Sequence, residues 1–230
     1  MSYVFVFVML IIMLFTASYR PISFETFADD TTSAPDYGSY GSIDQMTDQW
    51  LRKHTIRTFK LPLNLSKMTV PSNNEEEIKL LKDLTATLPT RQQTESIIKY
   101  EKYGVVPTFV QYCKKNGLKY KADQLRQIDL DIKKLTLQLK QIYNRQRPFQ
   151  VGIKPYQMID CHTPSYPSYR TCSAFVLADY LTKNNGRHKN DLQTIAKEVE
   201  MSRIIGGYNY PSDTEASRYV ADIVSKSLSL

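Results

Sequence analysis

The sequence has few of the residues that define several large classes of protein. Its 230 residues include 3 cysteines, 8 glycines and 11 prolines. Three cysteines are too few for a disulfide framework or a cysteine-rich zinc module. The low glycine and proline contents exclude collagen-like and low-complexity chains. Only one stretch is apolar enough to enter a membrane, which excludes a transporter or channel with several spans.

What remains is the composition of a folded protein, with charge distributed unevenly along the chain. Hydrophobic residues make up 42% and charged residues 23% of the sequence, and the formal net charge is +7. Residues 1–50 hold one basic and six acidic residues, so the other 180 residues carry a net charge of +12. A basic body of this kind attracts anions such as phosphate esters, nucleic acid or lipid headgroups.

Differences in composition divide the chain into three segments. Residues 3–17 are uncharged and almost wholly apolar. We therefore predict that residues 1–18 are either a signal peptide or a short membrane anchor. Both alternatives imply an exported or membrane-anchored protein, whether periplasmic, extracellular, lumenal or in a virion. Residues 19–50 are rich in serine, glycine and acidic residues, which predicts a flexible linker, and residues 51–230 are the predicted folded domain.

The folded domain is predicted to be helical. Helical patterns occur over residues 75–88, 123–143, 171–182, 190–203 and 211–228. In the first, an apolar face runs from Ile78 to Leu88, and in the second an apolar stripe runs from Leu125 to Ile142. No run of residues alternates convincingly like a strand. The sequence therefore predicts an all-α fold, a single packed helical bundle.

Three polar segments near predicted helix ends are the candidates for a functional site. Lys140 and Arg147 are seven residues apart at the close of the long helix, which predicts that they share one side of it. Ser168 precedes a helix start, where free N–H groups form a natural seat for phosphate. Arg203 precedes a Gly-Gly break. With Arg170, these cations would form an oxyanion pocket, because guanidinium groups bind phosphate oxygens in forked pairs. The alternative is that they are separate surface cations.

These segments resemble the signature of the acid phosphatase, type-2 phosphatidic acid phosphatase and vanadium haloperoxidase superfamily. That signature is K-x6-RP, then PSGH, then SR-x5-H-x3-D. The matching residues, at the correct spacing, are Lys140, Arg147-Pro148, Pro167-Ser168, Ser202-Arg203 and Asp213. The resemblance covers roughly residues 70–225, and residues 71–95 are similar to the helical lead-in of class A acid phosphatases. It implies the helical bundle of the phosphatidic acid phosphatase type 2 and haloperoxidase proteins.

The resemblance also implies roles for individual residues. The phosphate-binding residues would be Lys140, Arg147, Ser168, Arg170 and Arg203. Asp213 would orient the nucleophile. The family's nucleophile and general acid are both histidines, and Asn209 and Arg170 stand in their positions. An asparagine amide nitrogen is delocalised and not nucleophilic, and arginine keeps its proton at any working pH. We therefore expect a pocket that holds phosphate and performs no hydrolysis.

Three functional hypotheses follow. The first is a catalytically inactive phosphatase-like protein, exported or tethered to a membrane, that acts as a binding or structural component of an envelope or viral particle. The second is an active acid phosphatase, a phosphomonoester hydrolase with an altered mechanism that uses His162 or direct attack by water. The third is a basic module that binds anions, lipids or nucleic acid. Haloperoxidase activity would need a histidine at position 209 to bind vanadate, so we discount it.

The partners expected from these hypotheses are phosphate or a phosphorylated ligand, a membrane through residues 3–17, and proteins in an assembly. No specific nucleic acid, metal or other cofactor is expected. Cys161 and Cys172 bracket the second polar segment, and in an exported protein they could form a disulfide. Cys113 is expected to be a buried free thiol. We assign no function to His54 or His188.

Overall fold

The computed structural model describes residues 50–60, 65, 68–69, 75–156 and 163–228. All of these residues belong to one compact unit, Thr31–Leu230. The predicted leader and almost all of the predicted linker lie outside the described residues, so the division at residues 18 and 50 stays a prediction. Within the described ranges, no helix is both long enough and apolar enough to cross a membrane.

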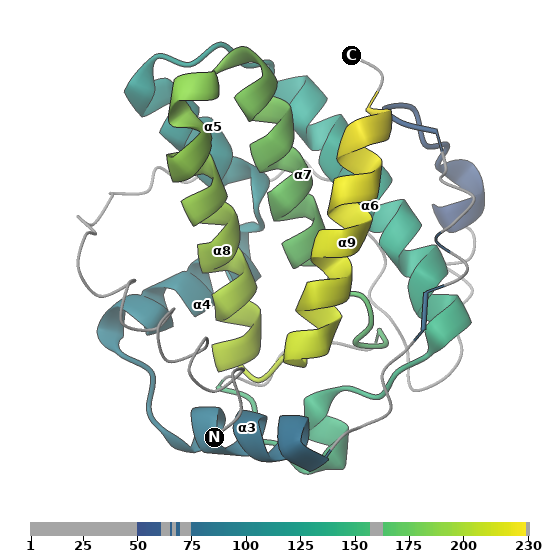
Figure 1. The fold of residues 1–230 in the computed structure, drawn as a ribbon, viewed down its shortest axis with the longest axis vertical. Helices are drawn as coiled ribbons and strands as arrows, with labels where there is room; N and C mark the ends of the chain where they lie inside the picture. Colours follow the sequence, from purple (N-terminus) through teal and green to yellow (C-terminus); the bar gives the residue numbers. More distant parts are fainter. Residues whose placement is uncertain (1–49, 61–64, 66–67, 70–74, 157–162, 229–230) are drawn as a thin grey trace. The chain divides into compact units, whose positions relative to one another are not determined.

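The described part of the chain is a helical bundle (Figure 1). Its helices are α3 (Glu75–Ala86), α4 (Arg91–Tyr103), α5 (Val106–Asn116), α6 (Ala122–Tyr143), α7 (Tyr169–Asn184), α8 (Lys189–Ile205) and α9 (Pro211–Ser227), with the short 3-10 helices η2 (Pro148–Val151) and η3 (Gly186–His188). Among these residues, the extended pairing is a single antiparallel bridge between Phe59 and Leu228. The prediction of an all-α fold is confirmed for this part of the chain.

Periodicity predicted five of these helices, each with ends within two residues of the observed ones. It did not predict α4 or α5. The sequence signal for α4 is a capping box: Gln93 N donates to Thr90 Oγ1 at 3.2 Å, and Thr90 N donates to Gln93 Oε1 at 2.8 Å. A threonine followed three residues later by glutamine is a recognised start signal for a helix.

Two residues of the predicted apolar faces lie outside the core. Leu88 is 86% exposed and Ile142 is 62% exposed. Helix α3 ends at Ala86, and Leu88 immediately precedes a proline, which disfavours helical backbone. In the last turns of α6, the buried face passes through Thr136 and Lys140 instead of Ile142.

Helix α7 lies at the centre of the bundle, where it packs against α6, α8 and α9 (Figure 1). Ten of its sixteen residues are buried, which is the pattern of a helix covered on all sides. Its apolar side chains join one core with residues such as Phe109, Ile132, Val199 and Val220. Hydrogen bonds join the segment at the start of α7 to the start of α9 and to the loop that follows α6.

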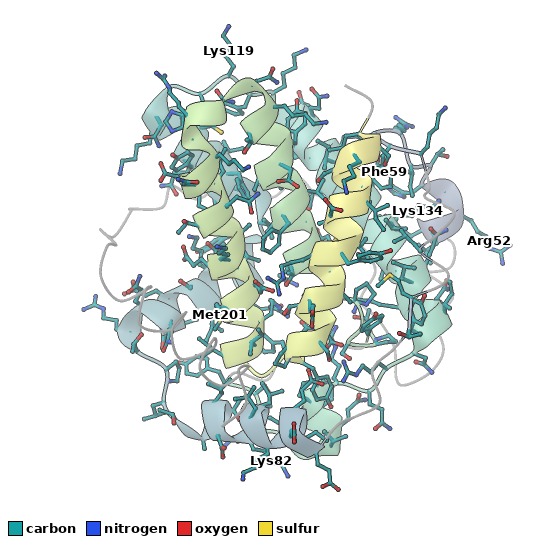
Figure 2. The ribbon with its side chains drawn as sticks, viewed as in Figure 1. Arg52, Phe59, Lys82, Lys119, Lys134 and Met201 are labelled. Carbon is teal, nitrogen blue, oxygen red and sulfur yellow. The ribbon has the colours of Figure 1, made fainter. Side chains whose placement is uncertain are left out.

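The segment before α3 packs onto α6. Arg57 N and Thr58 N each donate to Asp131 Oδ2 at 2.8 Å, and Lys134 Nζ donates to the carbonyl oxygen of Leu51 at 2.6 Å. Figure 2 shows Lys134 of α6 on the side of the bundle where this segment lies. These bonds tie the first described residues to the helical bundle.

Candidate functional site

The three predicted polar segments are joined by backbone hydrogen bonds at one end of the bundle. Ser165 N donates to Arg145 O at 2.9 Å, which links the first segment to the second. Ser168 N donates to Asp213 O at 3.4 Å, which links the second to the third. Helix α3 crosses this end of the bundle below α8 and α9 (Figure 1). Side chains that are distant in sequence therefore meet here.

Arg147 reaches this end through a loop, which corrects the prediction that it shares a helix face with Lys140. Helix α6 ends at Tyr143, and Asn144 adopts a left-handed φ of 42°. Arg147 then lies just before η2, and its guanidinium group is buried. The left-handed Asn144 ends the helix, so Arg147 is not placed by the helical spacing that starts from Lys140.

Lys140 and Arg147 both hold the loop at residues 163–164. The Nε of Arg147 donates to Thr163 O at 2.6 Å, and its Nη2 donates to Thr163 Oγ1 at 2.9 Å. Lys140 Nζ and Arg147 Nη2 both donate to the carbonyl oxygen of Pro164, the latter at 3.2 Å. A further bond at 2.8 Å runs from Arg147 Nη1 to Tyr208 O. Both cations are thus engaged with main-chain carbonyl groups.

Arg170 and Arg203 converge on Glu101 of α4, a residue that the sequence alone did not indicate. Arg203 Nη1 donates to Glu101 Oε2 at 2.5 Å, and Arg170 Nη2 donates to Glu101 Oε1 at 3.1 Å. Arg170 also donates from Nε to Tyr100 O at 2.9 Å and from Nη2 to Glu101 O at 3.1 Å. One carboxylate therefore bridges two of the four predicted phosphate-binding cations.

The electrostatics of Glu101 include a third arginine. Burial favours a raised pKa for Glu101, but the positive charges of Arg203, Arg170 and Arg147 outweigh it and lower the pKa below the ordinary value of 4.5. Burial lowers the pKa of Arg203, and the neighbouring Arg170 and Arg147 lower it further, while Glu101 opposes the shift. Arg170 and Arg203 are hydrogen-bonded to Glu101, and Arg147 acts on it through its charge. We use the name cationic cup for the four predicted phosphate-binding cations, Arg147, Arg170, Arg203 and Lys140, of which Lys140 contacts Pro164 and acts on Asp213 instead of Glu101.

Asn209 lies between Arg203 and Asp213 and is hydrogen-bonded to both side chains. Its Nδ2 donates to Ser165 O at 2.8 Å and to Asp213 Oδ2 at 3.4 Å, and its Oδ1 accepts from Arg203 Nε at 3.5 Å. The residue is buried. An amide nitrogen that donates its hydrogens in this way, and whose lone pair is delocalised, has no nucleophilic capacity.

Asp213 is fully buried and held by Arg145, another residue to which the sequence patterns assigned no role. Asp213 Oδ1 accepts from Arg145 Nη1 at 2.7 Å, and Oδ2 accepts from Tyr210 N at 2.8 Å. Burial raises the pKa of Asp213, while Arg145, the Tyr210 N–H and Lys140 oppose the rise. Arg145 Nη2 also donates to Glu77 Oε2 at 2.9 Å, so this cluster ties α3 to α9.

Ser168 and Tyr169 lie at the start of α7. Ser168 is the residue before the helix, as predicted, but its hydroxyl makes no cap bond to a helix N–H. Instead its Oγ accepts from Thr171 Oγ1 at 3.0 Å. Tyr169 OH donates to Asp129 Oδ2 at 2.7 Å. The tyrosine hydroxyl is thereby anchored to α6.

The described histidines have local partners. His54 stacks on Trp50, with ring centroids 4.0 Å apart, and His188 Nδ1 is hydrogen-bonded to Tyr112 OH at 2.9 Å. His162, the candidate for an altered mechanism, lies outside the described residues. In the described ranges, no group of three or more histidine, cysteine, aspartate and glutamate residues is arranged to hold a metal ion.

The cysteines in the described part of the chain are buried. Cys113 and Cys172 are free thiols, and burial raises the pKa of both. Cys161 lies outside the described residues, and the free thiol of Cys172 corrects the prediction of a disulfide between the two.

Comparisons with known proteins give a partial likeness in structure. No family model matches the sequence, and neither does any curated protein. Among similar solved structures is a transmembrane PAP2-type phosphatidylglycerolphosphate phosphatase from Bacillus subtilis. It has a TM-score of 0.49 and 16% sequence identity, over 71% of this chain and 90% of that chain. At these values the likeness does not assign the chain to a family.

Proposed function

We propose that this chain is a catalytically inactive phosphatase-like protein of the acid phosphatase, type-2 phosphatidic acid phosphatase and vanadium haloperoxidase superfamily. Its cationic cup would bind phosphate or a phosphorylated ligand without hydrolysing it. In this proposal the protein is exported or membrane-tethered and serves as a binding or structural component. Membership in the superfamily rests on the three motif segments and on their convergence at one end of the helical bundle.

The observation that carries the proposal is the environment of Asn209. Its amide nitrogen donates to Ser165 O and lies 3.4 Å from an oxygen of Asp213, the acid that would orient a nucleophilic histidine. At the position of the general acid, Arg170 donates to Glu101 and to the main chain of α4. Neither side chain can attack phosphorus or transfer a proton, because one nitrogen is an amide and the other group stays protonated.

A phosphatase assay on the full chain tests this proposal. We expect hydrolysis of p-nitrophenyl phosphate by the wild type to equal that of Arg203→Ala, since loss of a covalent nucleophile costs on the order of 10⁶-fold in rate. Arg126→Ala is the matched control, because Arg126 is an exposed arginine paired with Asp123. Hydrolysis by the wild type well above the Arg203→Ala background would refute inactivity.

The second candidate, an active phosphatase, is decided by the same assay. If wild-type activity exceeds the background and disappears in His162→Ala, His162 supports an altered mechanism. If activity survives both His162→Ala and Arg203→Ala, it comes from a contaminant. The double variant Asn209→His with Arg170→His restores both imidazoles, and a gain of activity in it would support the assignment of these two positions.

A further inference from the structure

We propose that Glu101 is an internal anion seated in the cationic cup, and that a phosphate-monoester dianion binds only by displacing its carboxylate. This inference rests on the proposed function, because it concerns the same site. It adds a residue outside the three motif segments, and it makes that residue the determinant of which anions the cup admits.

The geometry of Glu101 is that of a bound ligand. Its two oxygens accept from two different guanidinium groups, Oε2 from Arg203 at 2.5 Å and Oε1 from Arg170 at 3.1 Å. Hydrogen bonds from more than one guanidinium group to a single oxyanion are one way in which proteins hold phosphate. The cup thus holds a carboxylate where the motif segments would hold phosphate.

Helix α4 is positioned to deliver this carboxylate. Glu101 lies in the last turn of α4, where the main-chain carbonyls lack partners within the helix. Arg170 donates to two of these carbonyls, at Tyr100 and Glu101, as well as to the Glu101 carboxylate. Arg170 therefore anchors both the end of the helix and the side chain that it carries.

The burial of the three groups shows which of them lies nearer to solvent. The side chain of Arg203 is 4% exposed, whereas those of Glu101 and Arg170 are 21% and 23% exposed. The carboxylate thus lies nearer to solvent than Arg203 does, and a rotation of the Glu101 side chain would uncover Arg203.

The charges of the cup favour exchange for a dianion. Glu101 contributes one negative charge against Arg147, Arg170 and Arg203, which all act on it. A dianion neutralises more of this positive charge than a monoanion does, so it can compete with the carboxylate. A monoanion has no such advantage. It carries the same single negative charge as the Glu101 carboxylate, which is already held at the site by the protein chain.

A rival explanation gives Glu101 a purely positioning role, in which it holds Arg203 in place for an external anion. The two explanations predict opposite effects of Glu101→Gln. A glutamine keeps the size of the side chain and removes its negative charge. If Glu101 competes with the ligand, affinity for phosphate rises. If Glu101 only positions Arg203, affinity falls or stays the same.

Titration calorimetry with inorganic phosphate on the full chain measures this difference. We expect Glu101→Gln to bind phosphate at least about tenfold more tightly than the wild type, because a unit charge a few ångströms from the ligand in a partly buried site contributes more than a tenfold effect. Glu95→Gln is the matched control: it lies on the same helix, 56% exposed and paired with Arg91, and should leave the affinity unchanged. Glu101→Ala is the second variant, in case glutamine disturbs folding, and circular dichroism verifies the fold of each.

Equal or weaker binding of inorganic phosphate and of two further probes by the folded Glu101 variants overturns the inference. The comparison is repeated with glycerol 3-phosphate and with vesicles that contain phosphatidic acid, which distinguishes a soluble monoester from a lipid headgroup. A gain with any of these probes supports the displaced carboxylate, and no gain with all three overturns it. Hydrolysis of p-nitrophenyl phosphate by the wild type contradicts the proposed function separately, whatever the binding result.

Discussion

Replacement of Arg145 is the sharpest test of what stabilises this end of the bundle. Arg145 donates to Ser212 Oγ and Asp213 Oδ1 at 2.7 Å each and to Glu77 Oε2 at 2.9 Å. Its guanidinium carbon lies 4.2 Å from the centre of the Tyr210 ring. The side chains of Arg145 and Asp213 are 3% and 0% exposed. Arg145→Met therefore leaves two carboxylates, one of them fully buried, without this cation.

Removal of one partner from a buried ion pair costs about 3–5 kcal/mol, most of it from the uncompensated charge that remains. For a domain of about 150–250 residues, 1 kcal/mol shifts the melting temperature by about 2–4 °C. We therefore expect Arg145→Met to lower the melting temperature by about 6–20 °C. Arg145→Lys should fall between the wild type and Arg145→Met, because lysine keeps the charge but lacks the planar fork.

The measurement is urea unfolding and thermal unfolding followed by far-ultraviolet circular dichroism. Arg91→Met is the matched control, since Arg91 pairs with Glu95 at 2.9 Å but the two side chains are 93% and 56% exposed. An exposed pair contributes less than about 1 kcal/mol. A loss of unfolding free energy below about 1 kcal/mol in Arg145→Met, or one equal to that of the control, would show that the cluster does not stabilise the fold.

Two further predictions concern pH and thiol reactivity. Because neighbouring arginines lower the pKa of Glu101 below 4.5, its ionised form stabilises the folded state above about pH 4.5, and this stabilisation is lost as the pH falls through the lowered pKa. The unfolding free energy of the wild type should therefore decrease more steeply below pH 4.5 than that of Glu101→Gln, and parallel pH profiles contradict this. Burial raises the pKa of Cys113 to about 11 and also raises that of Cys172. In the folded variant Cys161→Ser, which leaves these two thiols as the chain's cysteines, neither should react with a disulfide reagent at neutral pH. Rapid reaction of either thiol in the folded protein would contradict their burial, and because both are free, both should react once the protein is denatured.

Local sequence patterns predicted much of the helical structure because the residues that face the core recur at helical spacing in those segments. The stripe from Leu125 to Leu139 on α6 is an example, since each apolar residue faces the core at helical spacing. Helix α4 shows where this fails: only three of its thirteen residues are buried, and one of them is Lys99. Its position depends on its cap and on contacts with α7 and α8 residues, which periodicity does not report.

The sequence by itself determined the helical class and the three polar segments, because these follow from local spacing and residue identity. Only the tertiary structure decided which carboxylate pairs with Arg170 and Arg203. Arg203 and Glu101 are 102 residues apart, and Arg145 and Glu77 are 68 apart. No local pattern encodes such pairs, since they form only when packing removes charged groups from water and each buried charge requires a partner.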